Sequence, residues 1–118
     1  MVRIYIYTDS MGTRMFDQYT YLHIASGIVA YFWGVPLLAW LVVHTIFEFV
    51  ENTEFGINVI DTYFWFWPGG GKHKMADSHA NIVGDTVGAV FGWLSSYYLD
   101  KLGAKYGYYP IHVKRSIL

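Results

Sequence analysis

The sequence predicts an all-α fold: a three-helix transmembrane bundle, made of a helical hairpin and a third glycine-rich helix, with an interfacial aromatic loop. Charged residues form 14% of the 118-residue chain and aromatic residues 20%, whereas soluble proteins average about 25% charged residues. Lys and Arg are absent from residues 15–71 and from residues 75–100. Because neither stretch could coat a soluble surface with cations, we expect one membrane-embedded domain over residues 1–118.

The first cation-free stretch divides into two helices, predicted over residues 19–33 and 36–52. Gly34-Val35-Pro36 separates them, because proline suits the first turn of a helix and glycine suits a helix end. Each arm is slightly shorter than the roughly 20 residues that span a hydrocarbon core of about 30 Å. One uninterrupted helix would be about 50 Å long, which exceeds a span. The hairpin is therefore preferred.

The third helix is predicted over residues 77–99, with Asp77 or Ser78 as its N-cap. The segment before it, residues 53–76, contains the aromatic run Tyr63-Phe64-Trp65-Phe66-Trp67 followed by Pro68-Gly69-Gly70-Gly71. Aromatic residues favour the headgroup boundary and a Pro-Gly run ends regular structure. We therefore expect an interfacial loop over residues 53–76.

Small residues recur every four positions along the third helix, which indicates a close helix–helix contact. The predicted packing residues are Ala80, Gly84, Gly88 and Gly92. Beside this seam lie three polar residues with the same spacing, Asp77, Asn81 and Asp85. A small-residue seam is more often a packing surface than a ligand site, so packing is the preferred interpretation.

The antiparallel topology gathers the polar residues of all three helices into one half of the bundle, and the opposite half is expected to be largely apolar. Ionisable groups are costly in a membrane interior, so they should pair, coordinate an ion or line a hydrated cavity. The predicted polar core comprises His23, His44, Glu48, Glu51, Asn52, Asp77, Asn81 and Asp85.

These motifs resemble a known family. The order His23, His44-x-x-x-Glu48-x-x-Glu51-Asn52 and Asp77-Ser78-x-x-Asn81-x-x-x-Asp85 is similar to a family of small bacterial membrane proteins related to the VanZ-like group. The Trp67-Pro68-Gly69-Gly70 stretch resembles short membrane proteins of large DNA viruses. The resemblance covers residues 19–99 and implies a compact helical membrane fold, but no reaction, because none is established for that family.

Two functions fit these observations. The first is an integral membrane structural or interaction protein, such as a minor component of a viral capsid with an internal membrane. Its membrane-embedded bundle would contact neighbouring subunits through the aromatic loop and the tail, residues 106–118. The net charge of −1 and the lack of a basic run exclude nucleic acid as an expected partner.

The alternative function is a metal-dependent membrane hydrolase that acts on a lipid-linked substrate. Imidazoles with carboxylates can bind a divalent ion and leave a site for water. The candidate metal ligands are His23, His44, Glu48 and Asp77, and the candidate catalytic residues are Glu48, Glu51 and Asp85. The His-x-x-x-Glu pattern lacks the second histidine of a zincin helix, so the sequence alone favours the structural role and no firm cofactor.

Overall fold

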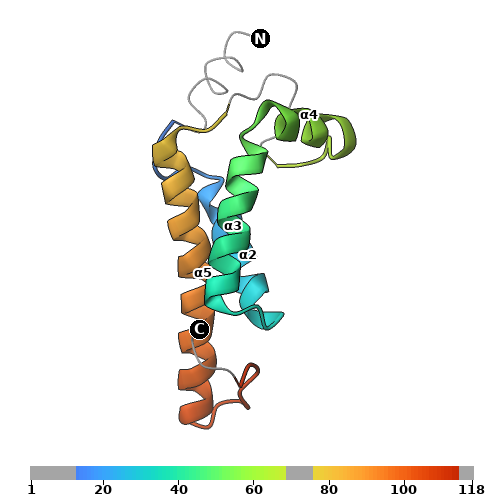
Figure 1. The fold of residues 1–118 in the computed structure, drawn as a ribbon. Helices are drawn as coiled ribbons and strands as arrows, with labels where there is room; N and C mark the ends of the chain where they lie inside the picture. The colour runs from blue at the N-terminus through green and yellow to red at the C-terminus, as the bar shows by residue number, and fades with distance from the viewer. Residues whose placement is uncertain (1–12, 69–75, 115–118) are drawn as a thin grey trace.

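The computed structural model describes residues 13–68 and 76–114, and within these ranges all regular structure is helical. Figure 1 shows three helices packed along one another, α2 (Thr20–Phe32), α3 (Leu37–Glu51) and α5 (His79–Lys105), with the short helix α4 (Glu54–Tyr63) at one end. The prediction of an all-α fold is confirmed. None of the described helices is both long enough and apolar enough to cross a membrane.

A tight turn at Gly34 creates the predicted hairpin. Gly34 has φ +79, a left-handed conformation that only glycine adopts without steric cost. Its N–H donates to Tyr31 O at 2.8 Å, and Pro36 then begins α3 from an extended conformation (φ −62, ψ 150). Both helices fall within one residue of the predicted ranges 19–33 and 36–52.

Helix α5 is longer than predicted. Its N-cap is Ser78, whose hydroxyl accepts the N–H of Asn81 at 3.2 Å, but the helix continues to Lys105 instead of ending near Leu99. Lys101 and Lys105 follow Leu99, and lysine is a good helix former, so these charges do not end the helix. The true stop is Gly107, which has φ +75.

The expected interfacial loop over residues 53–76 is also partly wrong, because it contains α4. Thr53 caps this helix by accepting the N–H of Gly56 at 3.0 Å, and Glu54 lies in its first turn. A threonine cap followed by an acidic residue is an ordinary helix start, which the aromatic content of the segment concealed. Within that expected loop, residues 69–75 lie outside the described residues.

Helices α2 and α5 make the closest contact in the bundle. A Cβ atom added to Gly92 would lie 2.0 Å from Ile24 O, and one added to Gly27 would lie 2.0 Å from Ala89 O. The two backbones therefore approach more closely than any larger residue would allow. Of the predicted packing residues, Gly84, Gly88 and Gly92 are buried, whereas Ala80 is exposed.

Two tryptophans fix α3 against this pair. Trp40 donates its indole N–H to Ala89 O at 3.2 Å, and Trp93 donates to Val35 O at 2.8 Å. The buried apolar core is small and centres on Ala30, Tyr31, Ala89 and Trp93. Many large apolar side chains instead lie on the outer faces of the helices, among them Val42, Val43, Ile46 and Phe49 of α3.

Candidate metal centre

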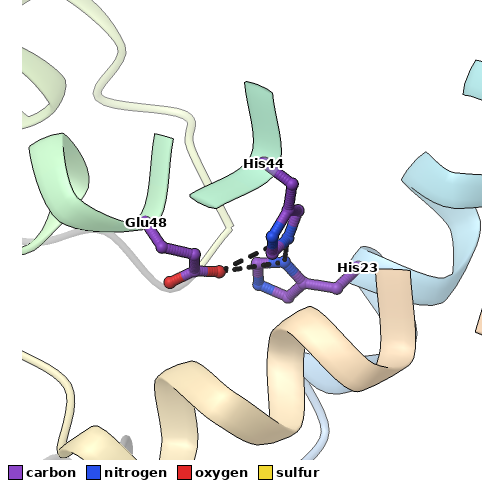
Figure 2. Close-up of side chains that lie close together, drawn as sticks. All are labelled: His23, His44 and Glu48. Carbon is purple, nitrogen blue, oxygen red and sulfur yellow. Dashed lines mark hydrogen bonds and ion pairs between the residues drawn. The ribbon is translucent and has the colours of Figure 1, made fainter. Parts of the chain in front are cut away.

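Three side chains from two helices converge near the end of the bundle that carries α4. His44 and Glu48 lie one turn apart on α3 and face His23 of α2, as Figure 2 shows. His23 Nδ1 lies 2.8 Å from His44 Nε2 and 3.3 Å from Glu48 Oε1. His44 Nε2 lies 3.5 Å from the same carboxylate oxygen. Two nitrogens and one oxygen thus form a compact triangle.

The triangle is buried but its hydrogen bonds are incomplete. His44 is 2% exposed and Glu48 is 0% exposed. Glu48 Oε1 and His44 Nδ1 have no hydrogen-bond partner among the described residues. Both imidazoles are near Oε1, but neither is aligned to donate to it. A buried polar atom without a partner costs about 1–3 kcal/mol, so this arrangement is better suited to an additional bound group.

The spacing of the three donors suits a transition-metal ion. An ion with tetrahedral bonds of about 2.0–2.1 Å holds neighbouring donors about 3.3–3.4 Å apart. Two sides of the triangle, at 3.3 and 3.5 Å, match that separation, and the third, at 2.8 Å, needs a small opening of the two rings. Two imidazoles and one carboxylate form a donor set typical of zinc-class ions.

A further carboxylate orients the first histidine. His23 Nε2, the ring nitrogen outside the triangle, lies 3.2 Å from Asp85 Oδ2. Asp85 is 2% exposed, and its other oxygen accepts the hydroxyl of Thr20 at 3.0 Å. A metal-binding histidine usually donates its second N–H to such a carboxylate. Sequence reasoning missed Thr20, although its position three residues before His23 places both on one helix face.

Glu48 also belongs to a second group of donors, with Glu51 and Asp77. In each group the donor atoms all lie within 4.8 Å of one another. Asn52 connects the end of α3 to the residues just before α5. Its Nδ2 donates to Glu48 O at 2.8 Å, and its Oδ1 accepts the N–H of Asp77 at 2.7 Å. The structure therefore places Asp77, a predicted metal ligand, with the acidic pair and not with the two histidines.

Asn81, the last predicted member of the polar core, has a different role. Its Nδ2 donates to Arg14 O at 2.8 Å and to Asp17 Oδ2 at 3.1 Å. It thus anchors the segment that precedes α2 to the start of α5.

The apolar core around Tyr31 and Trp93 lies in the opposite half of the bundle, as the prediction of a largely apolar half requires, but that half also contains a buried carboxylate that the prediction missed. Asp100 of α5 is 4% exposed and accepts the hydroxyl of Tyr31. It also accepts the backbone N–H groups of His112 at 2.8 Å and Val113 at 3.0 Å. The tail after α5 therefore folds back onto this carboxylate. The sequence prediction ended the third helix at Leu99, one residue too early to include it.

Comparisons with protein-family models, curated proteins and solved structures gave no match to this chain. The resemblance to VanZ-like and viral membrane proteins therefore stays a prediction.

Proposed function

We propose that this protein is a membrane-embedded helical protein that binds a zinc-class divalent ion through His23, His44 and Glu48 and hydrolyses a lipid-linked ester. The observation that carries the proposal is the buried triangle of donors in which Glu48 Oε1 lacks a hydrogen bond. A purely structural polar core should satisfy its buried atoms. This core does not, which favours the metal centre over the structural role that the sequence alone suggests.

Three protein donors leave one tetrahedral position for water, as in catalytic rather than structural zinc sites. In the hydrolysis, the water oxygen would join the acyl or phosphoryl centre and the bond to the alkoxide would break. Glu51, a neighbour of Glu48 in the second donor group, is the proposed general base. It would take the proton of the water and return it to the leaving oxygen.

Exposed apolar side chains support the membrane location. Val42, Val43, Ile46 and Phe49 are between 51% and 67% exposed, and no Lys or Arg occurs from residue 15 to residue 71. At 1.5 Å per residue α2 and α3 are about 20 and 22 Å long. A bilayer core of about 30 Å would have to thin locally around this hairpin.

Elemental analysis of the purified protein tests the metal centre. We expect bound zinc in the wild type and its loss in His44→Ala, because one of three donors is removed. His112→Ala is the matched control, since His112 is exposed and lies at the other end of the bundle. Equal zinc in all three proteins, or none in the wild type, would contradict the proposal. Zinc-dependent release of headgroups from mixed phospholipid vesicles tests the hydrolysis.

The membrane topology can be tested by cysteine labelling, because the chain has no cysteine. Glu54 and Tyr108 are exposed. Glu54 begins α4, which Figure 1 shows at one end of the bundle, and Tyr108 follows the last residue of α5, Lys105, at the other end. In sealed vesicles, a membrane-impermeant reagent should label only one of the variants Glu54→Cys and Tyr108→Cys. Equal labelling of both before permeabilisation would refute a spanning bundle.

A role within a larger assembly is the second candidate function, and exposed aromatic residues favour it. Trp65 and Tyr108 are each 80% exposed, and aromatic residues are enriched at protein interfaces. A photo-reactive residue at position 65 should cross-link to protein in the native assembly. One at position 42, on the apolar face of α3, should cross-link to lipid. Protein cross-links at neither position would argue against such an assembly.

A further inference from the structure

The end of the bundle that carries the tail, here called the tail end, has a basic surface. The sequence places four cations there, Lys101, Lys105, Lys114 and Arg115, and a single acidic side chain, Asp100. Asp100 is 4% exposed and accepts hydrogen bonds from Tyr31 and the tail, so it adds little charge to the surface. Lys105 and Lys114 are exposed, whereas Arg115 lies outside the described residues. The described surface charge of the tail end is therefore positive.

The end that carries α4 and the candidate metal centre differs in charge. Glu54 is exposed there, and Asp17, Asp61 and Asp77 are partly exposed. Arg14 is an exposed cation at this end, while residues 69–75, with their two lysines, lie outside the described residues. Within the described part of the chain, only the tail end combines exposed cations with no exposed carboxylate.

Tyrosines surround the lysines of the tail end. Tyr106 and Tyr108 are 65% and 80% exposed. Lys105 Nζ lies 5.7 Å from the centre of the Tyr106 ring, and Lys101 Nζ lies 5.4 Å from the centre of the Tyr97 ring. Tyrosine and lysine together are typical of the headgroup region of membrane proteins, because each has an apolar body and a polar tip that reaches water or phosphate.

Helix α5 carries this surface beyond the hairpin. It has 27 residues and is therefore about 40 Å long, and Figure 1 shows its last turns extending past the turn between α2 and α3. The tail stays beside these turns, because Asp100 accepts the N–H groups of His112 and Val113. A bilayer with its headgroups is about 40–45 Å thick. A bundle embedded by its hairpin would thus place Lys105 and Tyr108 among the headgroups.

We propose that the tail end is a docking surface for anionic phospholipid headgroups, whose phosphates Lys105 and Lys114 contact. Charge complementarity identifies this partner, because cations are attracted to an anionic surface, and a zwitterionic one has no net charge to attract them. The inference rests on the membrane location in the proposed function and not on its metal centre. It orients the bundle, with the tail end at the leaflet richer in anionic lipid. The candidate metal centre then faces the opposite leaflet, from which a lipid-linked substrate would come.

Spin-labelled lipids test this surface, with the full chain reconstituted in phosphatidylcholine vesicles. Electron paramagnetic resonance measures the labelled lipid that contact with the protein slows, and so compares phosphatidylglycerol with phosphatidylcholine. We expect the wild type to prefer phosphatidylglycerol and the double variant Lys105→Gln/Lys114→Gln to lose most of that preference. Each cation near an anionic surface contributes up to about fivefold. Salt at about 1 M should also remove the preference, because it shortens the screening length to about 3 Å.

Arg14→Gln is the control, because it removes an exposed cation at the other end, where carboxylates offset its charge. It should change the lipid preference much less than the double variant. Circular dichroism confirms that each variant is folded.

The outcomes separate this inference from the proposed function. Slowed lipid without a preference for phosphatidylglycerol, or a preference that the double variant keeps, would overturn the docking surface and leave the membrane location standing. A loss in Arg14→Gln as large as in the double variant would also overturn the assignment to the tail end. No slowed lipid of either kind would overturn the membrane location and this inference together, whereas the metal centre is judged by elemental analysis alone.

Discussion

Two of the buried carboxylates in the bundle, those of Asp100 and Glu48, lie in very different surroundings. Asp100 is 4% exposed and accepts hydrogen bonds from the Tyr31 hydroxyl and the N–H groups of His112 and Val113. Glu48 is 0% exposed, but its Oε1 has no donor and its Oε2 has one distant donor, Asn52. One carboxylate is saturated by its own chain and the other is not.

This difference separates a structural carboxylate from one that we propose to be a metal ligand. A saturated buried carboxylate recovers the cost of its desolvation from charge-assisted hydrogen bonds, so nothing further is needed for the native fold. An unsaturated one leaves that cost in place unless a ligand offsets it. A buried carboxylate therefore fastens the tail at the Asp100 end, whereas at the Glu48 end a buried carboxylate oxygen is left without a donor among the described residues.

The largest effect on stability is expected at the saturated carboxylate. Asp100→Ala would leave the buried Tyr31 hydroxyl and two backbone N–H groups without their acceptor, and breaking a buried charged contact costs about 3–5 kcal/mol. The free energy of unfolding in detergent, measured without metal, should fall by about that amount. Asp100→Asn should lose less, because one oxygen remains. A loss below about 1 kcal/mol for the alanine variant would contradict the assignment of Asp100 as a structural anchor.

Glu48→Gln should change the free energy of unfolding little in the metal-free protein and strongly in the metal-bound one, which is the opposite of the effect expected for Asp100→Ala. The amide keeps the shape of the side chain but removes the charge that a divalent ion requires. If zinc affinity falls at least about 100-fold, zinc at 100 times the wild-type Kd adds about 2.7 kcal/mol to the wild type and little to the variant. Melting curves without and with zinc measure the stability of the metal-free protein and the stabilisation that zinc adds. Equal zinc stabilisation in the two proteins would place the ion elsewhere.

Asp85→Asn should have an intermediate effect, because Asp85 contacts His23 and is not among the three proposed metal ligands. Loss of a carboxylate behind a metal-binding histidine typically costs 10–100-fold in affinity. Zinc titration should show this drop with unchanged stoichiometry. Thr20→Val, which removes only the hydrogen bond to Asp85 Oδ1, should lower the affinity less. An Asp85→Asn variant with wild-type zinc affinity would show that Asp85 and Thr20 do not hold His23 in its binding orientation.

The sequence predicts the hairpin because Gly34 and Pro36 are local signals that no tertiary contact overrides. It also places His23, His44 and Glu48 in one half of the bundle, because antiparallel helices leave little choice of neighbours. It cannot show that Glu48 Oε1 lacks a donor, since that depends on ring orientations and on distances of a few tenths of an ångström. Nor does it reveal Asp100 as an anchor, because the tail that satisfies this carboxylate has no periodic pattern of its own.

The smallest effect is expected at Lys101, which tests whether the tail depends on Asp100 or on several weak contacts. Lys101 Nζ donates to Val113 O at 2.9 Å and lies 5.4 Å from the centre of the Tyr97 ring. Lys101→Met keeps the apolar stem but removes the charge and the partly buried hydrogen bond to Val113 O, so the loss of that bond alone should cost about 0.5–1 kcal/mol. Lys105→Met is the control and should leave the free energy of unfolding unchanged, because Lys105 is exposed. If Lys101→Met lowered the free energy of unfolding as much as Asp100→Ala, the tail would be held by several contacts of similar strength. Asp100 would then not be its main structural anchor, and the contrast with Glu48 would fail.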